Sequence, residues 1–169
     1  ASSQATEPVP LRFFLAGDGT LALTSTHGGG SATVRYRDSK GHYDAAALAK
    51  LRRVMRSADG AEGPLPLRLV EALAWLQHET GRRPLTVISG YRSPAHNEDI
   101  RAQGKRAAAA SLHTEGLAAD LAFPRRDLPA LWHRIRTREC CGAGMYKDQG
   151  FLHFDVGRPR FWEPATSRV

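Results

Sequence analysis

Two short stretches of the sequence combine histidine and aspartate, the residue types that bind a transition metal or move a proton. The stretch "SLHTEGLAADL" holds His113 and Asp120 seven positions apart, and "FLHFDVG" holds His153 and Asp155 two positions apart. Imidazole nitrogens and carboxylate oxygens are common ligands of zinc. Three such ligands leave a position for water, which is the arrangement of a catalytic zinc site.

The spacing of His113 and Asp120 sets a condition for a shared metal ion. Seven residues rise about 10.5 Å along a continuous helix and about 23 Å along a strand. Both distances are too long for two side chains that must each reach within about 2 Å of one ion. The chain must therefore fold back between them, and Gly116 allows such a turn. Asp120 lies in the apolar run "LAADLAF", where a buried carboxylate needs a partner such as a metal.

The stretch "FLHFDVG" reads as a strand whose two faces differ. Successive side chains of a strand point to opposite faces, so Phe151, His153 and Asp155 share one face. Leucine, phenylalanine and valine occupy the other face, as in a strand that packs on a core. His153 would complete a set of three ligands with His113 and Asp120.

The stretch "SGYRSPAHN" adds a cation to these residues. A predicted strand ends at Ser89, Gly90 allows a sharp turn, and Arg92 follows where side chains leave the edge of a sheet. The guanidinium group of arginine is suited to holding a carboxylate or a polarised carbonyl through two parallel hydrogen bonds. We therefore treat Arg92 as a candidate catalytic residue.

The length and composition indicate one globular domain. The chain has 169 residues, of which 41% are hydrophobic and 24% charged, and single domains usually run about 100–200 residues. We expect residues 1–10 to form a flexible N-terminal segment and residues 11–165 a single domain. No apolar run approaches the ~20 residues of a membrane span. The small, polar first residues fit a processed or trimmed chain, for which a removed signal peptide is one explanation and an artificially chosen start is another. We expect a periplasmic or exported protein.

The net charge of +7 implies attraction to polyanions. Nucleic acid, anionic lipid and anionic cell-wall polymer all qualify, but no nucleic-acid-binding motif accompanies the charge. We therefore expect no nucleic-acid partner. Cys140 and Cys141 are adjacent, and adjacent cysteines rarely pair because the ring is strained, so a disulfide framework is not expected.

Hydrophobic periodicity predicts strands and helices in mixed order. Helices are expected over residues 44–56, 67–80 and 127–138, and another after a turn in which Ser93 caps and Pro94 begins the helix. Strands are expected over residues 11–17, 20–26, 31–37, 84–90, 117–123, 142–146 and 150–157, the first two joined by "DG" as a hairpin. The order predicts the α+β class, with a mainly antiparallel central sheet flanked by helices.

Taken together, "SGYRSPAHN", "SLHTEGLAADL", "GAGMY" and "FLHFDVG" resemble, in this order, the motifs of the zinc D-Ala-D-Ala metallopeptidase family. The wider group includes lysostaphin and the hedgehog fold. The chain is most similar to the periplasmic murein endopeptidases of the K type, from about residue 10 to Trp162. The resemblance implies a zinc peptidase domain over residues 11–165 with a hedgehog-like or D-Ala-D-Ala peptidase-like zinc site.

The resemblance also implies a role for each candidate residue. One Zn²⁺ ion per chain would be held by His113, Asp120 and His153, and Arg92 would hold the substrate carbonyl or stabilise its oxyanion. Three further residues are expected to bind substrate by lining the cleft: Ser111, Tyr146 and His96.

The catalytic base is the point at which this chain departs from the family pattern. Several relatives carry an acidic residue three positions before the last ligand, or a histidine two positions before it. Gly150 and Phe151 stand at these positions and neither can take a proton. Asp155 is the nearest remaining candidate for the base. It is alternatively a group that orients an imidazole, a fourth ligand, or a surface carboxylate.

The resemblance implies a zinc-dependent peptidoglycan hydrolase, an endopeptidase that uses metal-activated water to cleave crosslinks between murein stem peptides. The D,D crosslink and the crosslink between two diaminopimelate residues are both candidate substrates. A D,D-carboxypeptidase or dipeptidase acting on terminal D-Ala is an alternative. A catalytically weak, zinc-containing cell-wall binding module is another, because the expected base is missing. We expect the chain to act as a monomer on peptidoglycan stem peptides.

Overall fold

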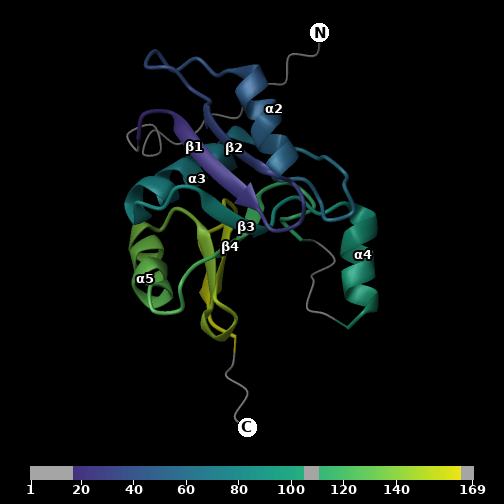
Figure 1. The fold of residues 1–169 in the computed structure, drawn as a ribbon. Helices are drawn as coiled ribbons and strands as arrows, with labels where there is room; N and C mark the ends of the chain where they lie inside the picture. The colour runs from purple at the N-terminus through teal and green to yellow at the C-terminus, as the bar shows by residue number, and fades with distance from the viewer. Residues whose placement is uncertain (1–16, 105–110, 165–169) are drawn as a thin grey trace.

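The computed structural model describes residues 17–104 and 111–164, in which three helices pack against one seven-stranded sheet and a fourth helix lies to one side of it (Figure 1). The strand order is β2-β1-β3-β4-β6-β5-β7. The strands are β1 Thr20–Ser25, β2 Ser31–Arg35, β3 Leu85–Ser89, β4 Ala118–Ala122, β5 Gly142–Tyr146, β6 Phe151–Asp155 and β7 Phe161–Trp162. The helices are α2 Ala45–Val54, α3 Leu67–Thr80, α4 Pro94–Ala102 and α5 Leu128–Arg138, and a 3₁₀ turn, η1, covers Lys147–Gln149.

The α+β class is confirmed, but the sheet is more mixed than the sequence predicted. Within the described ranges, β1 pairs in parallel with β3 and β5 pairs in parallel with β7. The other pairings are antiparallel. The parallel contact between β1 and β3 arises because the chain crosses over through α2 and α3 before it returns to the sheet. A crossover of this kind leaves no local sequence signal, whereas a hairpin does.

The predicted elements lie close to the observed ones. The predicted capping residues Asp44 and Ser93 each accept a backbone N–H in the first turn of α2 and α4, and Gly81 ends α3 in the left-handed region. The hairpin in the structure joins β1 to β2. The strand predicted over residues 11–17 lies, apart from Gly17, outside the described residues, as does the expected flexible segment 1–10.

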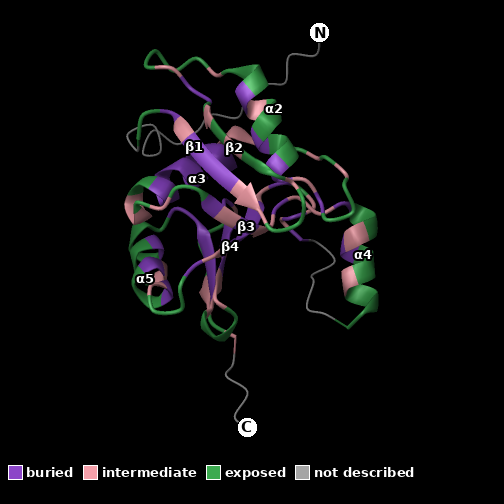
Figure 2. Cartoon of the chain, viewed as in Figure 1, coloured by how far each residue is buried: buried purple, intermediate pink, exposed green. Residues whose placement is uncertain are grey.

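The hydrophobic core lies on one face of the sheet, under α3 and α5. Leu121 pairs with Leu152, which pairs with Met145, so buried side chains form a row across three strands. Figure 2 shows this burial in the strands and on the inner sides of the helices. Fully burying a leucine side chain contributes about 1.5–3 kcal/mol, so this row stabilises the strands that also carry the polar residues of the opposite face.

A buried carboxylate ties the N-terminal hairpin to α3. Glu71 is fully buried, and it accepts hydrogen bonds from the hydroxyl groups of Tyr36 and Tyr43, each at 2.8 Å. The Nε of Arg37 donates to the same carboxylate at 2.7 Å. A buried charge is tolerated when it is paired and hydrogen-bonded in this way. No helix in the described part of the chain is both long and apolar enough to cross a membrane.

Candidate metal centre

The chain folds back between His113 and Asp120, as a shared metal ion requires. Gly116 has φ of +70°, and the N–H of Leu117 bonds to the carbonyl of Leu112 at 2.9 Å, which closes the turn. A Cβ atom at Gly116 would lie 2.0 Å from the carbonyl oxygen of Pro64. Glycine is therefore needed both for the backbone conformation and for the close approach.

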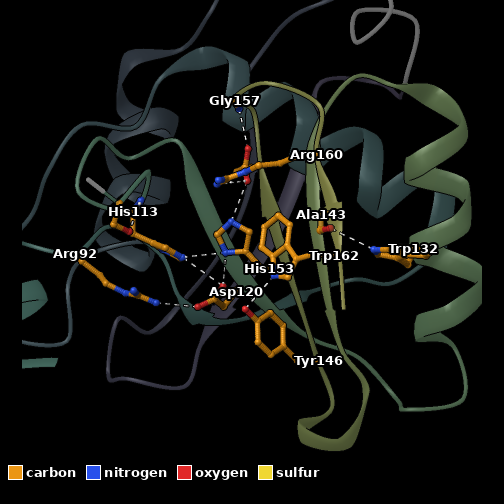
Figure 3. A network of polar contacts seen from close by, with 12 residues as sticks. Arg92, His113, Asp120, Trp132, Ala143, Tyr146, His153, Gly157, Arg160 and Trp162 are labelled. Carbon is orange, nitrogen blue, oxygen red and sulfur yellow. Dashed lines mark hydrogen bonds and ion pairs between the residues drawn. The ribbon is translucent and has the colours of Figure 1, made fainter. Parts of the chain in front are cut away.

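The sheet places Asp120 beside His153. The two residues pair directly across the antiparallel strands β4 and β6, on the face opposite the core. Asp120 Oδ1 lies 2.9 Å from His153 Nδ1 and 3.3 Å from His113 Nε2, and the two imidazole nitrogens are 3.3 Å apart (Figure 3). Residues from a loop and two strands thus bring three ligand atoms together, and they form a group that could hold a metal ion.

The size of this triangle fits a single small cation. Ligand atoms at about 2.0–2.1 Å from a tetrahedral ion are about 3.3 Å from one another. The three observed separations are 2.9, 3.3 and 3.3 Å. Two imidazole nitrogens and one carboxylate oxygen are also the donor set that zinc accepts.

The outer nitrogen of each imidazole has an acceptor that fixes its tautomer. His113 Nδ1 lies 2.7 Å from the carbonyl oxygen of Gly90, and His153 Nε2 lies 3.0 Å from Asp155 Oδ2. Both partners accept, so when a metal ion is bound each outer nitrogen would carry the proton and each inner nitrogen would present a lone pair to the ion. Two lone pairs and a carboxylate oxygen then face one another, an arrangement that a bound cation stabilises.

The charges of the site are set by these contacts. Burial acts to raise the pKa of Asp120, but hydrogen bonds with His113 and His153 outweigh it and hold that pKa well below its ordinary value of 3.8. Burial acts to lower the pKa of His153, but hydrogen bonds to Asp120 and Asp155 outweigh it and raise that pKa above 6.5. The site therefore attracts positive charge, and a proton competes with a metal ion for the same place.

Asp155 lies behind His153, away from the three ligand atoms. It is fully buried, and its Oδ1 accepts the backbone N–H of Gly157 at 2.9 Å while Oδ2 also accepts from Arg160 at 3.3 Å. Burial acts to raise the pKa of Asp155, but the hydrogen bond and charge of His153 outweigh it and lower that pKa below 3.8. A Cβ atom at Gly142 would lie 2.4 Å from Asp155 Oδ2, so glycine makes room for the carboxylate. Of the roles expected for Asp155, this geometry favours the orientation of an imidazole over proton transfer.

Arg92 lies at the site and contacts a ligand. Its Nη2 donates to Asp120 Oδ2 at 3.0 Å, its Nε donates to Ser89 Oγ at 3.0 Å, and its backbone N–H bonds to the carbonyl of His113. The side chain is 14% exposed, close to the 13% of His153. Arg92 therefore carries a fixed positive charge beside the carboxylate of Asp120, at the accessible edge of the centre.

The three expected substrate-binding residues lie in different places. Ser111 is buried, and its Oγ accepts the backbone N–H of His113 at 3.3 Å, so it shapes the ligand loop. Tyr146 ends β5 on the face that carries the centre, and its hydroxyl accepts the Nε1–H of Trp162 at 3.2 Å. His96 lies in the first turn of α4, where its backbone N–H bonds to Ser93 Oγ. Among the described residues, no hydrogen bond joins His96 to any of the three ligands, so its role in substrate binding stays a prediction.

Trp162 and Gly144 are site residues to which sequence reasoning gave no role. Gly144 pairs with His153 on one side and with Trp162 on the other. A Cβ atom at Gly144 would lie 2.4 Å from the indole ring, whose centroid is 5.2 Å from that of His153. The signal available in the sequence was the alternation of glycine with larger residues in "GAGMY", which leaves one face of β5 open.

A sheet and its adjoining loop that bring two histidines and an aspartate to tetrahedral spacing, with both imidazoles oriented from behind, are typical of metal-dependent hydrolases. Comparison with known proteins gives the family. The chain belongs to the family described as Peptidoglycan L,D-endopeptidase MepK, whose model matches residues 16–162.

Curated relatives carry the same description. The chain is 33% identical over 145 residues to the Peptidoglycan L,D-endopeptidase MepK of Escherichia coli, an alignment that covers 84% of this chain and 79% of the relative. The protein of the same name from Shigella flexneri gives the same identity and coverage. No solved structure matches the chain significantly.

Proposed function

We propose that this protein is a zinc-dependent peptidoglycan endopeptidase that cleaves L,D crosslinks between stem peptides. The observation that carries the proposal is the triangle of His113 Nε2, Asp120 Oδ1 and His153 Nδ1, with sides of 2.9, 3.3 and 3.3 Å. The family and the curated relatives are named for this activity on peptidoglycan, which selects the substrate class.

We propose His113, Asp120 and His153 as the zinc ligands. A zinc ion held there supplies a Lewis acid that lowers the pKa of water and polarises a carbonyl group. Gly90 and Asp155 keep the two imidazoles in the tautomers that ligation needs, because each accepts the proton of an outer nitrogen. Every ligand comes from the same chain, so a monomer is sufficient for the site.

We propose that Arg92 supplies fixed positive charge to the scissile carbonyl. Ser89 and Asp120 hold its guanidinium group in place before substrate arrives. A charge that needs no reorganisation during the reaction is more effective than a mobile one, since negative charge develops on the carbonyl oxygen in the transition state. In this proposal Asp155 orients His153, and it does not act as the proton acceptor that the sequence suggested.

The bond named for the relatives is an L,D bond, and this favours the diaminopimelate type of crosslink over the D,D type. The net charge of +7 favours association with an anionic polymer, although this attraction is weak and screened by salt. A substrate of this kind supports a location in the periplasm or in another exported compartment, which we propose for this protein.

Product analysis tests the proposal. Purified peptidoglycan rich in L,D crosslinks is incubated with the protein, and the released muropeptides are separated by chromatography. We expect L,D-crosslinked dimers to disappear and monomers to accumulate, with D,D-crosslinked dimers left intact. His153→Ala, which removes one ligand, is expected to give no products.

Three other results would identify a different function. Loss of D,D-crosslinked dimers alone would indicate a D,D-endopeptidase. Release of free D-Ala without loss of dimers would indicate a carboxypeptidase. If the protein binds to peptidoglycan but releases no new products, it would be a binding module whose zinc site has a structural role.

A further inference from the structure

An aromatic pair stands beside the metal ligands on the same face of the sheet. Trp162 comes from the short strand β7 and crosses the space left by Gly144, so that its ring lies against His153, 5.2 Å between centroids. Tyr146 lies two positions further along β5, where it pairs with Phe151. Tyr146 is thus a diagonal neighbour of His153 on this face, within reach of a long aromatic side chain.

The phenol of Tyr146 is fixed on two sides. Its ring stacks on that of Phe151, with centroids 4.3 Å apart and planes 9° apart, and its oxygen accepts the Nε1–H of Trp162 at 3.2 Å. An indole N–H can only donate, so the phenol oxygen is the acceptor and its own O–H must point elsewhere. Within residues 17–104 and 111–164, no protein group accepts that proton in a hydrogen bond.

The unused O–H lies on the side of the metal ligands. Figure 3 shows the Tyr146 side chain with its hydroxyl end turned toward Asp120 and His153 and its ring directed away from them. The opposite edge of the centre holds Arg92, two of whose nitrogens are already bound to Ser89 and Asp120. A substrate carbonyl at the centre would therefore meet one neutral donor on the Tyr146 side and one cation on the Arg92 side.

We propose that the Tyr146 hydroxyl donates a hydrogen bond to the oxygen of the scissile carbonyl, and that Trp162 is the positioning residue that aims it. This inference rests on the proposed endopeptidase function. No proton is transferred: the phenol stays protonated, and the hydrogen bond strengthens as negative charge accumulates on the carbonyl oxygen. Such a donor acts mainly on the transition state, because the carbonyl oxygen of the bound substrate carries less charge.

Kinetics of Tyr146→Phe test the proposal, with Tyr43→Phe as the matched control. Removing one oxyanion donor typically lowers kcat by about 100-fold or more, so we expect that loss in Tyr146→Phe with KM and zinc affinity unchanged. Tyr43→Phe also removes one tyrosine hydroxyl, but this hydroxyl contacts Glu71 and not the metal centre. We therefore expect Tyr43→Phe to keep the wild-type kcat.

Two further variants separate the hydrogen bond from Trp162 to Tyr146 from the packing of the Trp162 ring on His153. Trp162→Phe keeps a ring beside His153 but loses the N–H, and we expect a smaller loss of kcat than in Tyr146→Phe. The double variant is expected to lose no more than Tyr146→Phe alone, because Trp162 acts through the hydroxyl. A phosphinate peptide that mimics the tetrahedral transition state is expected to bind Tyr146→Phe more weakly, by the same factor as the loss of kcat, whereas product affinity stays constant.

The outcomes distinguish the inference from the function on which it rests. Wild-type protein that cleaves no crosslink overturns both. Wild-type cleavage with unchanged kcat in Tyr146→Phe overturns the inference alone, and so does a change confined to KM, which would make Tyr146 a wall of the binding cleft. A fall in zinc affinity in Tyr146→Phe also overturns it, because the residue would then support the metal ligands rather than the substrate.

Discussion

Replacing Asp155 by asparagine tests how the protein fixes His153 for metal binding. The carboxylate accepts through both oxygens: Oδ2 from His153 at 3.0 Å and from Arg160 at 3.3 Å, and Oδ1 from the N–H of Gly157 at 2.9 Å. An asparagine amide of the same shape keeps only one acceptor oxygen. At one of these contacts the amide N–H₂ group must therefore face another donor.

Either orientation of the amide loses one of these contacts, and one of the two disturbs the zinc ligand His153. An amide nitrogen facing His153 favours the tautomer with the proton on Nδ1, the nitrogen that lies 2.9 Å from Asp120. An amide nitrogen facing Gly157 leaves a backbone N–H without its acceptor, at a cost of about 1–3 kcal/mol. Mutating an outer partner of a ligating histidine typically weakens metal affinity about 10–100-fold, which corresponds to roughly 1.4–2.7 kcal/mol of binding free energy.

A competition titration against a chromophoric zinc chelator measures this change. Asp148→Asn is the matched control, because Asp148 lies on the exposed η1 turn just before β6 and should leave zinc affinity as in the wild type. Wild-type zinc affinity in a folded Asp155→Asn protein would refute the positioning role. If that variant instead lost kcat while keeping its zinc affinity, Asp155 would be the proton acceptor.

Further predictions concern stability, pH and packing. Glu71→Gln removes the buried carboxylate that pairs with Arg37 and accepts from two tyrosine hydroxyls, so urea unfolding should show a loss of about 1–3 kcal/mol with zinc affinity unchanged; unchanged stability would contradict the pairing. Because the pKa of His153 is raised in the folded protein, protonated His153 stabilises the zinc-free fold at pH values below 6.5. This stabilisation is lost as the pH rises through the raised pKa. Unfolding of metal-free protein across that range should show the decline, His153→Ala should flatten it, and an equal slope in both would be contrary evidence. Gly144→Ala places a Cβ atom 2.4 Å from Trp162 and should displace the indole, which lowers kcat and shifts tryptophan fluorescence, and an unshifted spectrum would count against the contact.

Much of the ligand set follows from local sequence patterns. The seven-residue spacing of His113 and Asp120 predicted a turn at Gly116, and the turn is there with φ of +70°. The alternation in "FLHFDVG" placed His153 on the face opposite the core, because a strand's period of two is a local property. Both predictions depend only on backbone geometry over a few residues.

The contacts behind the ligands depend on register between distant strands, and no local pattern contains that information. The carbonyl of Gly90 orients His113 across 23 positions of sequence, and Arg92 turned out to bind Asp120. The strand that carries Trp162 has two residues, too few for any periodicity. Its place beside His153 is fixed by parallel pairing with β5, which only the folded sheet defines.

Zinc reconstitution of the metal-free protein tests the central claim most directly: one zinc ion, held by His113, Asp120 and His153, is what the endopeptidase reaction needs. Cleavage of an L,D-crosslinked muropeptide is followed while zinc is added in steps to protein stripped with a chelator. The rate should rise from zero, reach its maximum at one zinc per chain and then stay level, and His113→Ala should remain inactive throughout. Full activity in the metal-free protein, or normal reconstitution of His113→Ala, would contradict the account.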